Sequence, residues 1–214
     1  MMTLLNCYLP LFRFIADFTQ NPNEYRDYDL FRAKSMAILK AALLSSELAH
    51  PRQDCKDAYF AVVIWLDERV LCSSHEWVRQ WRNQLLQNHF FQTSVGGEEF
   101  FTRLDSIDPM NTPLRMVYLF CLLMGFRGKY TWQDPLLLQK RIKGERKILP
   151  VEWRAWPNEA QLIEQEPQRN EGRHSGRKKF RQRKWLMLLV IVVIYMSMLA
   201  FGLELIFKGF YYVL

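Results

Sequence analysis

An uncharged apolar run near the carboxyl end constrains this chain more than any other feature of its sequence. Residues 185–202 read WLMLLVIVVIYMSMLAFG, and the run continues to Phe207 with Glu204 as its single ionisable residue. About 20 apolar residues suffice for a helix to cross the hydrocarbon core of a bilayer, whereas core helices of soluble proteins seldom run this long without a charge. Glu204 would lie near the far interface, where a carboxylate costs little. The sequence therefore predicts a transmembrane helix over residues 185–207.

A basic cluster lies directly before this run. Its closely spaced cations, with no acidic residue between them, are Arg177, Lys178, Lys179, Arg181, Arg183 and Lys184. Clusters of this kind stay on the cytoplasmic side of a membrane and attract anionic lipid. We therefore expect the N-terminus in the cytoplasm and residues 208–214 as a short tail on the far side.

The placement of charge argues against a nucleic-acid partner. The chain of 214 residues has a net charge of +7, from 29 basic and 22 acidic residues. Residues 173–214 contain eight of the basic residues and one of the acidic ones, which leaves 21 of each sign in residues 1–172. A nucleic-acid-binding domain carries its basic excess on its fold, so we expect no nucleic acid among the partners.

Residues 1–150 are predicted to form an all-α domain of seven or eight helices, because apolar residues recur there at helical spacing. The predicted segments are 4–19, 29–50, 54–73, 76–91, 98–104, 114–124 and a charged helix at 134–147. Asp54 is expected to cap the third segment. In the second, one helical stripe is apolar, which is typical of a core-facing side; it contains Leu30, Ala33, Ala37, Ala41, Leu44 and Leu48. Residues 151–184 are polar and proline-containing, and are predicted to be a linker.

Catalytic, cofactor and metal chemistry find little support in the sequence. The four cysteines are scattered, with no CxxC pair, as expected for reduced cytoplasmic thiols. Cys72 and His75 lie three residues apart, but with His89 they form no second ligand pair, so we expect no metal. The phosphate-binding patterns GxxxxGK[ST] and GxGxxG are absent. We therefore predict no cofactor, no catalytic residue and no enzymatic activity.

Three short motifs follow one another in the helical part. The first is Asp67-Glu68 within the apolar segment AVVIWLDERVL. Adjacent helix positions diverge by about 100°, so these carboxylates are poorly placed to act on one substrate. We expect one of them to cap a neighbouring helix or to pair with an arginine, and the other to face solvent.

The second and third motifs are rich in glycine and phenylalanine. The second, residues 96–101, contains Gly96, Gly97, Glu98, Phe100 and Phe101, and the third, residues 124–130, contains Gly125, Phe126, Gly128 and Tyr130. We expect a loop with positive φ at the glycine pair, acidic residues in the first turn of the next helix, and a core position for both phenylalanines. The glycines of the third motif are expected to end a buried helix.

In this order, and with an anchor near the carboxyl end, the motifs resemble the DotU/TssL family of bacterial secretion systems. Members of that family pair a Leu-Asp-Glu helix with a Gly-Gly-Glu-x-Phe-Phe turn and a Leu-Gly-Phe-x-Gly-x-Tyr turn. The resemblance covers roughly residues 10–145. It departs from the family at residues 73–77, where SSHEW stands in place of a small residue and Trp-Gly, and at Met124, where the family has Leu.

The resemblance implies a fold, a location and a role. The fold would be a hook-like cytoplasmic domain of two small helical bundles, held in the bacterial inner membrane by one transmembrane helix, with the carboxyl end in the periplasm. The role would be a structural part of a type VI secretion system that anchors the baseplate to the trans-envelope complex. The implied partners are a TssM/IcmF-like inner-membrane protein, baseplate subunits, an outer-membrane lipoprotein reached indirectly, the lipid bilayer and further copies of the chain. The motif residues would be partner contacts or determinants of the fold.

Three alternatives stay open on the sequence alone. A DotU-type stabilising subunit of a type IVB system would share the motifs, and neighbouring genes would separate it from a type VI component. A membrane-tethered enzyme would need a pocket with convergent polar groups. A module that binds anionic lipid would depend on the basic residues 173–184, and reversal of those charges would abolish its binding to vesicles.

Overall fold

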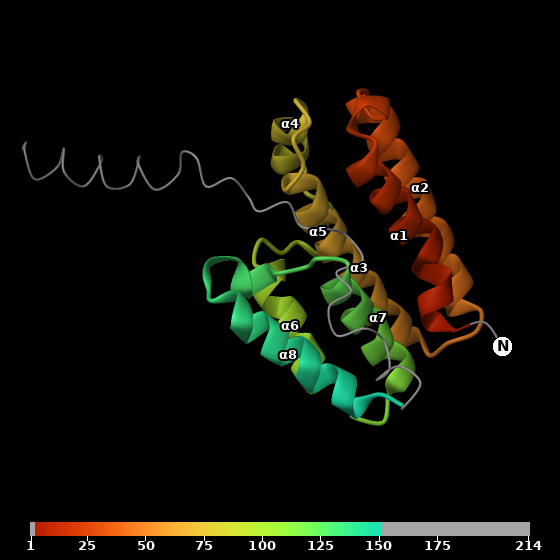
Figure 1. The fold of residues 1–214 in the computed structure, drawn as a ribbon. Helices are drawn as coiled ribbons and strands as arrows, with labels where there is room; N and C mark the ends of the chain where they lie inside the picture. The colour runs from red at the N-terminus through yellow and green to blue at the C-terminus, as the bar shows by residue number, and fades with distance from the viewer. Residues whose placement is uncertain (1–2, 151–214) are drawn as a thin grey trace, which may run out of the picture. The chain divides into compact units, whose positions relative to one another are not determined.

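The computed structural model describes residues 3–150, and all regular secondary structure in this range is helical. Figure 1 shows the arrangement of the helices. The α-helices are α1 (Leu4–Gln20), α2 (Tyr28–Glu47), α3 (Arg52–Leu71), α4 (Val78–Asn83), α5 (Leu86–Phe91), α6 (Gly96–Ser106), α7 (Thr112–Leu123) and α8 (Pro135–Ile148); two short 3-10 helices are η1 (Pro22–Glu24) and η2 (Gly128–Trp132). The prediction of an all-α domain is confirmed for this part of the chain.

Several predictions concern residues beyond this range. The predicted linker 151–184, with its six clustered cations, the predicted transmembrane helix 185–207 and the tail 208–214 all lie outside the described residues. Within residues 3–150, no helix combines the length and the apolar character that crossing a membrane requires. The hook shape and the division into two bundles stay predictions.

Helix α3 lies at the centre of the described domain. It contacts α1 and α2 on one side, and α6 and α7 on the other, as Figure 1 shows, and it also contacts α4 and α5. Every residue from Ala58 to Asp67 is buried. A helix that is apolar around its whole circumference can be stable only when neighbours surround it, which explains why the central position falls to this segment.

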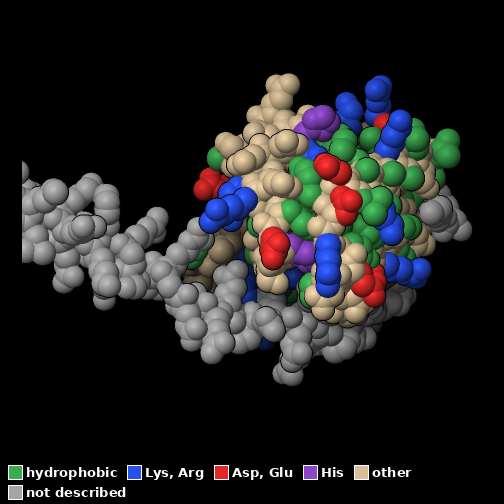
Figure 2. Space-filling view, turned by 90° about the horizontal axis from the view of Figure 1, so that it is seen from above, with side chains coloured by type: hydrophobic (Ala, Val, Ile, Leu, Met, Phe, Trp, Pro, Cys, Tyr) green, Lys and Arg blue, Asp and Glu red, His purple; other side chains and the backbone are tan. Residues whose placement is uncertain are grey.

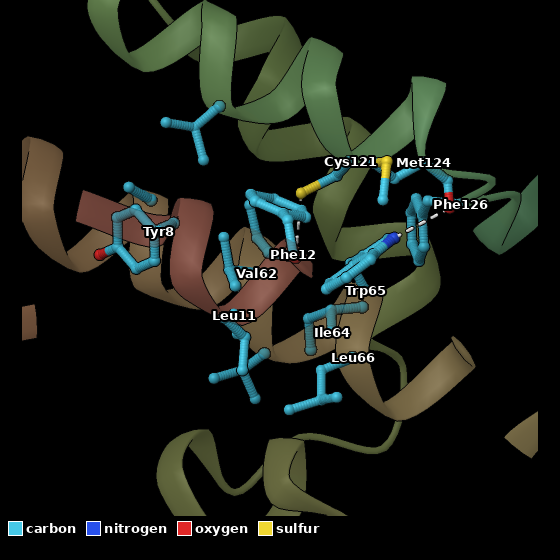
Figure 3. Close-up of a cluster of buried hydrophobic side chains, with 14 of the residues drawn as sticks. Tyr8, Leu11, Phe12, Val62, Ile64, Trp65, Leu66, Cys121, Met124 and Phe126 are labelled. Atoms are coloured by element: carbon cyan, nitrogen blue, oxygen red, sulfur yellow. Dashed lines mark hydrogen bonds between the residues drawn. The ribbon is translucent and has the colours of Figure 1, made fainter. Parts of the chain in front are cut away.

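The main core joins α1, α3 and the end of α7. The ring of Phe12 lies 4.5 Å from the ring of Trp65 and 4.6 Å from that of Phe120, measured between centroids. The indole of Trp65 is fully buried, and its N–H donates to the carbonyl of Met124 at 3.2 Å. Figure 3 shows this bond among the packed side chains. Because the polar atom of the indole is satisfied, Trp65 contributes its large apolar surface to the core without a desolvation penalty.

Helix α2 packs against the core with the face opposite to the predicted one. Its buried residues are Phe31, Ser35, Leu39, Ala42 and Ser46, whereas every member of the predicted stripe is exposed. Both serines are tolerated in the interior because their hydroxyls donate to helix carbonyls at 2.8 and 2.7 Å. The prediction was wrong because the stripe of alanine and leucine is as apolar as the true core face. Apolar side chains also reach the surface between charged ones on the face shown in Figure 2.

Two predicted helix boundaries are wrong as well. Pro51, not Asp54, is the N-cap of α3, and the carboxylate of Asp54 instead accepts a hydrogen bond from the side-chain amide of Asn111 at 2.9 Å. The segment predicted as one helix over 76–91 is divided into α4 and α5, with a break at Gln84 and Leu85.

A partly buried ion network attaches α8 to the rest of the domain. The guanidinium of Arg115 on α7 contacts the carboxylate of Glu145 on α8 at 2.8 Å. Arg141 contacts the same carboxylate at 2.9 Å and also Asp105 on α6 at 2.6 Å. Because the carboxylate of Glu145 has two cationic partners, its charge is compensated inside the protein, and the acidic residue of α8 therefore faces inward.

Substitution of Gly144 tests whether this position of α8 is open to solvent. It lies inside the helix, and a Cβ added there would meet nothing within 4 Å. Since glycine in a helix interior costs about 0.5–1 kcal/mol relative to alanine, Gly144→Ala should raise the free energy of unfolding by that amount. Thermal unfolding of the detergent-solubilised full chain, followed by circular dichroism, measures the change. A lower melting temperature would contradict the open surroundings of Gly144.

Candidate functional site

The three sequence motifs meet at one place in the described domain, which we call the motif junction. It consists of the carboxyl half of α3, the amino end of α6 and the turn between α7 and η2. Its residues are Asp67, Glu68, Gly96, Gly97, Phe100, Phe101, Gly125, Phe126, Gly128 and Tyr130, with Glu98 in the first turn of α6.

Asp67 caps the start of α5 from inside the domain. The residue is 2% exposed, and its Oδ1 accepts hydrogen bonds from the indole N–H of Trp81 at 2.8 Å and from the amide of Leu86 at 3.1 Å. Its Oδ2 accepts from the amide of Gln87 at 2.8 Å. Leu86 and Gln87 are the first residues of α5, whose amides lack partners within the helix. Asp67 therefore supplies the cap that begins a new helix and separates α4 from α5.

The protonation of Asp67 reflects a balance between burial and hydrogen bonding. Burial raises the pKa of this carboxyl group to about 6, and the three N–H donors and the nearby guanidinium of Arg32 act in the opposite direction. Arg32 itself lies 5.2 Å from the centroid of the Trp81 ring. Both carboxylate oxygens are engaged by the cap, so the shifted pKa accompanies a structural role.

Glu68 serves a different loop from its neighbour. Its Oε1 accepts from the amide of Arg127 at 2.7 Å, and its Oε2 accepts from the amide of Gly128 at 2.8 Å. Burial raises the pKa of Glu68. The expectation that one of the two carboxylates faces solvent was therefore wrong. The divergence of adjacent helix positions lets one segment of α3 hold two separate loops.

The glycine pair of the second motif is required for close packing and not for a positive φ. Gly96 and Gly97 are the first residues of α6, and in the described residues the glycines with positive φ are Gly125 and Gly128. A Cβ on Gly96 would lie 2.4 Å from Cδ1 of Ile64, and a Cβ on Gly97 would lie 3.2 Å from Cα of Gly128. The predicted loop conformation is corrected accordingly.

The third motif ends α7 as predicted. Gly125 has a φ of 91°, and its amide donates to the carbonyl of Leu122 at 3.1 Å. The amide of Phe126 donates to the carbonyl of Cys121 at 3.0 Å. This pair of bonds is the Schellman motif, which satisfies the last carbonyls of a helix and needs a left-handed residue after it. The prediction of a glycine C-cap is confirmed.

Aromatic rings fill the space between the glycines. Phe100 and Phe101 are fully buried, as predicted. The ring of Phe100 lies 4.3 Å from that of Phe126, and the ring of Phe101 lies 4.9 Å from that of Tyr130. The second and third motifs therefore pack directly on each other. The motif junction is held together by close backbone contacts, helix caps and packed aromatic rings.

An aromatic cluster that includes His75 was missed by the sequence reasoning. The imidazole stacks on Phe18 at 4.3 Å and lies 4.9 Å from the ring of Trp77, while its Nε2 is 3.0 Å from the carbonyl of Pro22. Burial lowers the pKa of His75. Within residues 3–150, no three potential metal ligands lie together. The aromatic richness of residues 12–31 and 75–81 was the available signal for this cluster.

These features define a class of protein: an all-helical domain in which the motif residues fix helix ends and turns. The chain belongs to the DotU family, since the model of the family described as type VI secretion system protein DotU matches residues 3–206. The resemblance seen in the motifs is thereby confirmed. The chain is a membrane-associated component of a type VI secretion system, and the family to which it belongs is a structural one.

Two solved structures have a similar fold. One is the cytoplasmic domain of TssL from Acinetobacter baumannii, with 23% identity, a TM-score of 0.61, and coverage of 69% of this chain and 97% of that chain. The other is SciP/TssL from enteroaggregative Escherichia coli 042, with 23% identity, a TM-score of 0.57, and coverage of 69% and 88%. At this identity the likeness shows the fold. The comparison with curated proteins found no match.

Proposed function

We propose that this chain is a non-enzymatic inner-membrane scaffold that anchors the cytoplasmic baseplate of a type VI secretion system to the trans-envelope complex. The observation that carries the proposal is the motif junction, where Asp67 and Glu68 hold α5 and the turn after α7 by five hydrogen bonds to buried or half-buried donors. Groups locked by packing and hydrogen bonds present their surroundings in one geometry. Such rigidity suits a platform that partners recognise, and the family match supports the secretion role.

The proposed topology follows from the end of the chain. Residues 185–207 would cross the inner membrane once, with the basic cluster Arg177–Lys184 held in the cytoplasm and residues 208–214 in the periplasm. The family match extends to residue 206, so it includes nearly all of this apolar run. The described domain would then lie on the cytoplasmic side, where the baseplate assembles.

The proposed partners divide between the two parts of the chain. The apolar run would contact a TssM/IcmF-like inner-membrane protein and a second copy of this chain, since small residues such as Ser197, Ala200 and Gly202 permit close helix packing. The helical domain would contact baseplate subunits, and the outer-membrane lipoprotein would be reached through the inner-membrane partner.

Charges placed inside the apolar run test this division. Val190→Arg together with Val193→Arg should release the chain from membranes on carbonate washing, because an arginine at the centre of a spanning helix costs roughly 2.5–3.5 kcal/mol in insertion. The conservative pair Val190→Leu and Val193→Leu is the matched control and should stay in the membrane fraction. Affinity purification of each variant with mass spectrometry should recover the IcmF-like protein with the control alone, and baseplate subunits with both.

Release of the wild-type chain by carbonate would overturn the anchoring proposal. Recovery of neither class of partner with the wild-type chain would overturn the scaffold proposal.

A further inference from the structure

The outward face of α8 combines three lysines with an exposed leucine and an exposed glycine. Leu136, Gln139, Lys140, Lys143, Gly144 and Lys147 line a shallow, open hollow, and all of them are exposed. Their spacing of three and four residues places them on one side of the helix. Three lysines thus follow one another along about two turns.

No acidic side chain of α8 shares this face. Glu145 is buried on the opposite side, where it pairs with Arg115 and Arg141. The carboxylate of Asp134 lies at the N-cap and accepts from the amide of Leu136. Asp105 of the neighbouring α6 is paired with Arg141. The positive charge of the lysines is therefore compensated by no acidic residue of their own face.

Large apolar side chains are exposed at the amino end of α8 and in the 3-10 helix η2 directly before it. Leu136 is 65% exposed and shares the lysine face, Leu137 is 47% exposed, and Trp132 at the end of η2 is 79% exposed. Tryptophan and leucine beside lysines are typical of helices that lie in the headgroup region of a bilayer, where the apolar groups enter the acyl boundary and the lysines stay among phosphates.

We propose that this face of α8, with Trp132, docks on the anionic cytoplasmic surface of the membrane. The proposal rests on the proposed function to the extent that residues 185–207 keep the domain close to a bilayer. A lipid surface fits better than an acidic protein for two reasons. Lysines carry compact charges suited to a diffuse layer of headgroups, whereas arginine is preferred for paired recognition of carboxylates. The chain also continues from α8 through the basic cluster Arg177–Lys184 to the apolar run, so the same leaflet is within reach.

A fluorophore on α8 tests the docking in the full chain. Gln139→Cys in a Cys72→Ser background provides the labelling site, and the labelled protein is reconstituted in vesicles that contain lipids with a quencher at the headgroup. In vesicles of phosphatidylcholine that contain about 30% phosphatidylglycerol, we expect strong quenching of the fluorophore. The quenching should be lost in vesicles of pure phosphatidylcholine, and also in anionic vesicles at about 0.5 M salt.

Charge reversal distinguishes binding through the lysines of α8 from binding through the net charge of the protein. Lys140→Glu, Lys143→Glu and Lys147→Glu together should weaken the docked state by about 100-fold or more, since each lysine near an anionic leaflet is worth roughly a fivefold change. Lys40→Glu, Lys56→Glu and Arg82→Glu make the same charge change at other exposed sites and should leave the quenching intact.

Three outcomes would each overturn the docking proposal. The first is equal quenching in zwitterionic and anionic vesicles. The others are an equal loss of quenching in the two triple variants and unchanged quenching after charge reversal on α8. Loss of an acidic protein partner with unchanged quenching would assign the face to a protein instead. Carbonate extraction of the same samples reports on the anchor independently, because its alkaline pH removes the charge of the lysines. A chain that carbonate releases should bind anionic vesicles again at neutral pH if its α8 face is intact.

Discussion

Gly128→Ala is expected to lower the free energy of unfolding by roughly 2–5 kcal/mol, from a left-handed backbone penalty of about 1–2 kcal/mol and an overpacking cost of about 1–3 kcal/mol. Gly128 has a φ of 48°, and an added Cβ would lie 2.6 Å from the carbonyl oxygen of Gly97 and 2.9 Å from Cζ of Phe126. Neither neighbour moves easily, because the first is backbone and the second is a fully buried ring.

Chemical unfolding of the detergent-solubilised chain measures this loss, and Gly144→Ala is the matched control. Both variants add one methyl group to a glycine, but the two sites differ in φ and in the space around them. We expect opposite signs: a loss at Gly128 and a gain at Gly144. The same sign and size at both positions would show that the junction of the second and third motifs is not tightly packed.

Removal of the Asp67 carboxylate is expected to cost roughly 3 kcal/mol or more. Asp67→Ala leaves the amides of Leu86 and Gln87 and the buried indole N–H of Trp81 without their acceptor, and each unsatisfied buried donor costs about 1–3 kcal/mol. Tryptophan fluorescence during urea unfolding reports on the loss. Asp67→Asn keeps the shape and one acceptor oxygen, so it should be less destabilising than Asp67→Ala. Equal stability of wild type and Asp67→Ala would refute the capping role.

The raised pKa of Asp67 adds a pH test. In the folded state this pKa is about 6, above the ordinary value of 3.8. The folded chain therefore binds the proton more tightly, and the stability gained from that proton is present below about pH 4 and is lost as the pH rises through 6. Asp67→Asn should flatten the fall in stability over this window. Glu68 also has a raised pKa and acts in the same direction, so a residual slope is expected; an unchanged slope would contradict the assignment to Asp67.

Local patterns predicted some elements well and others poorly. The glycine C-cap of α7 was predictable, because it depends on a few adjacent residues and on the conformational freedom of Gly125. The break between α4 and α5 was not, because its cap comes from Asp67, 19 residues before Leu86. The face of α2 was missed because two of its sides are similarly apolar, and only packing against its neighbours selects Phe31 and Leu39 for the interior.

The sequence by itself determined the helical class of residues 3–150, the segregation of positive charge toward the carboxyl end, and the motifs that place the chain in its family. Hydrophobic periodicity, charge and glycine content are properties of neighbours along the chain, so they can be read without a fold. Only the tertiary structure decided that Gly97 meets Gly128, that Asp67 and Glu68 hold two different loops, and that the lysines of α8 face outward while Glu145 faces in. Those facts depend on which segments approach one another in space, and close approach and burial are properties of the whole packed domain.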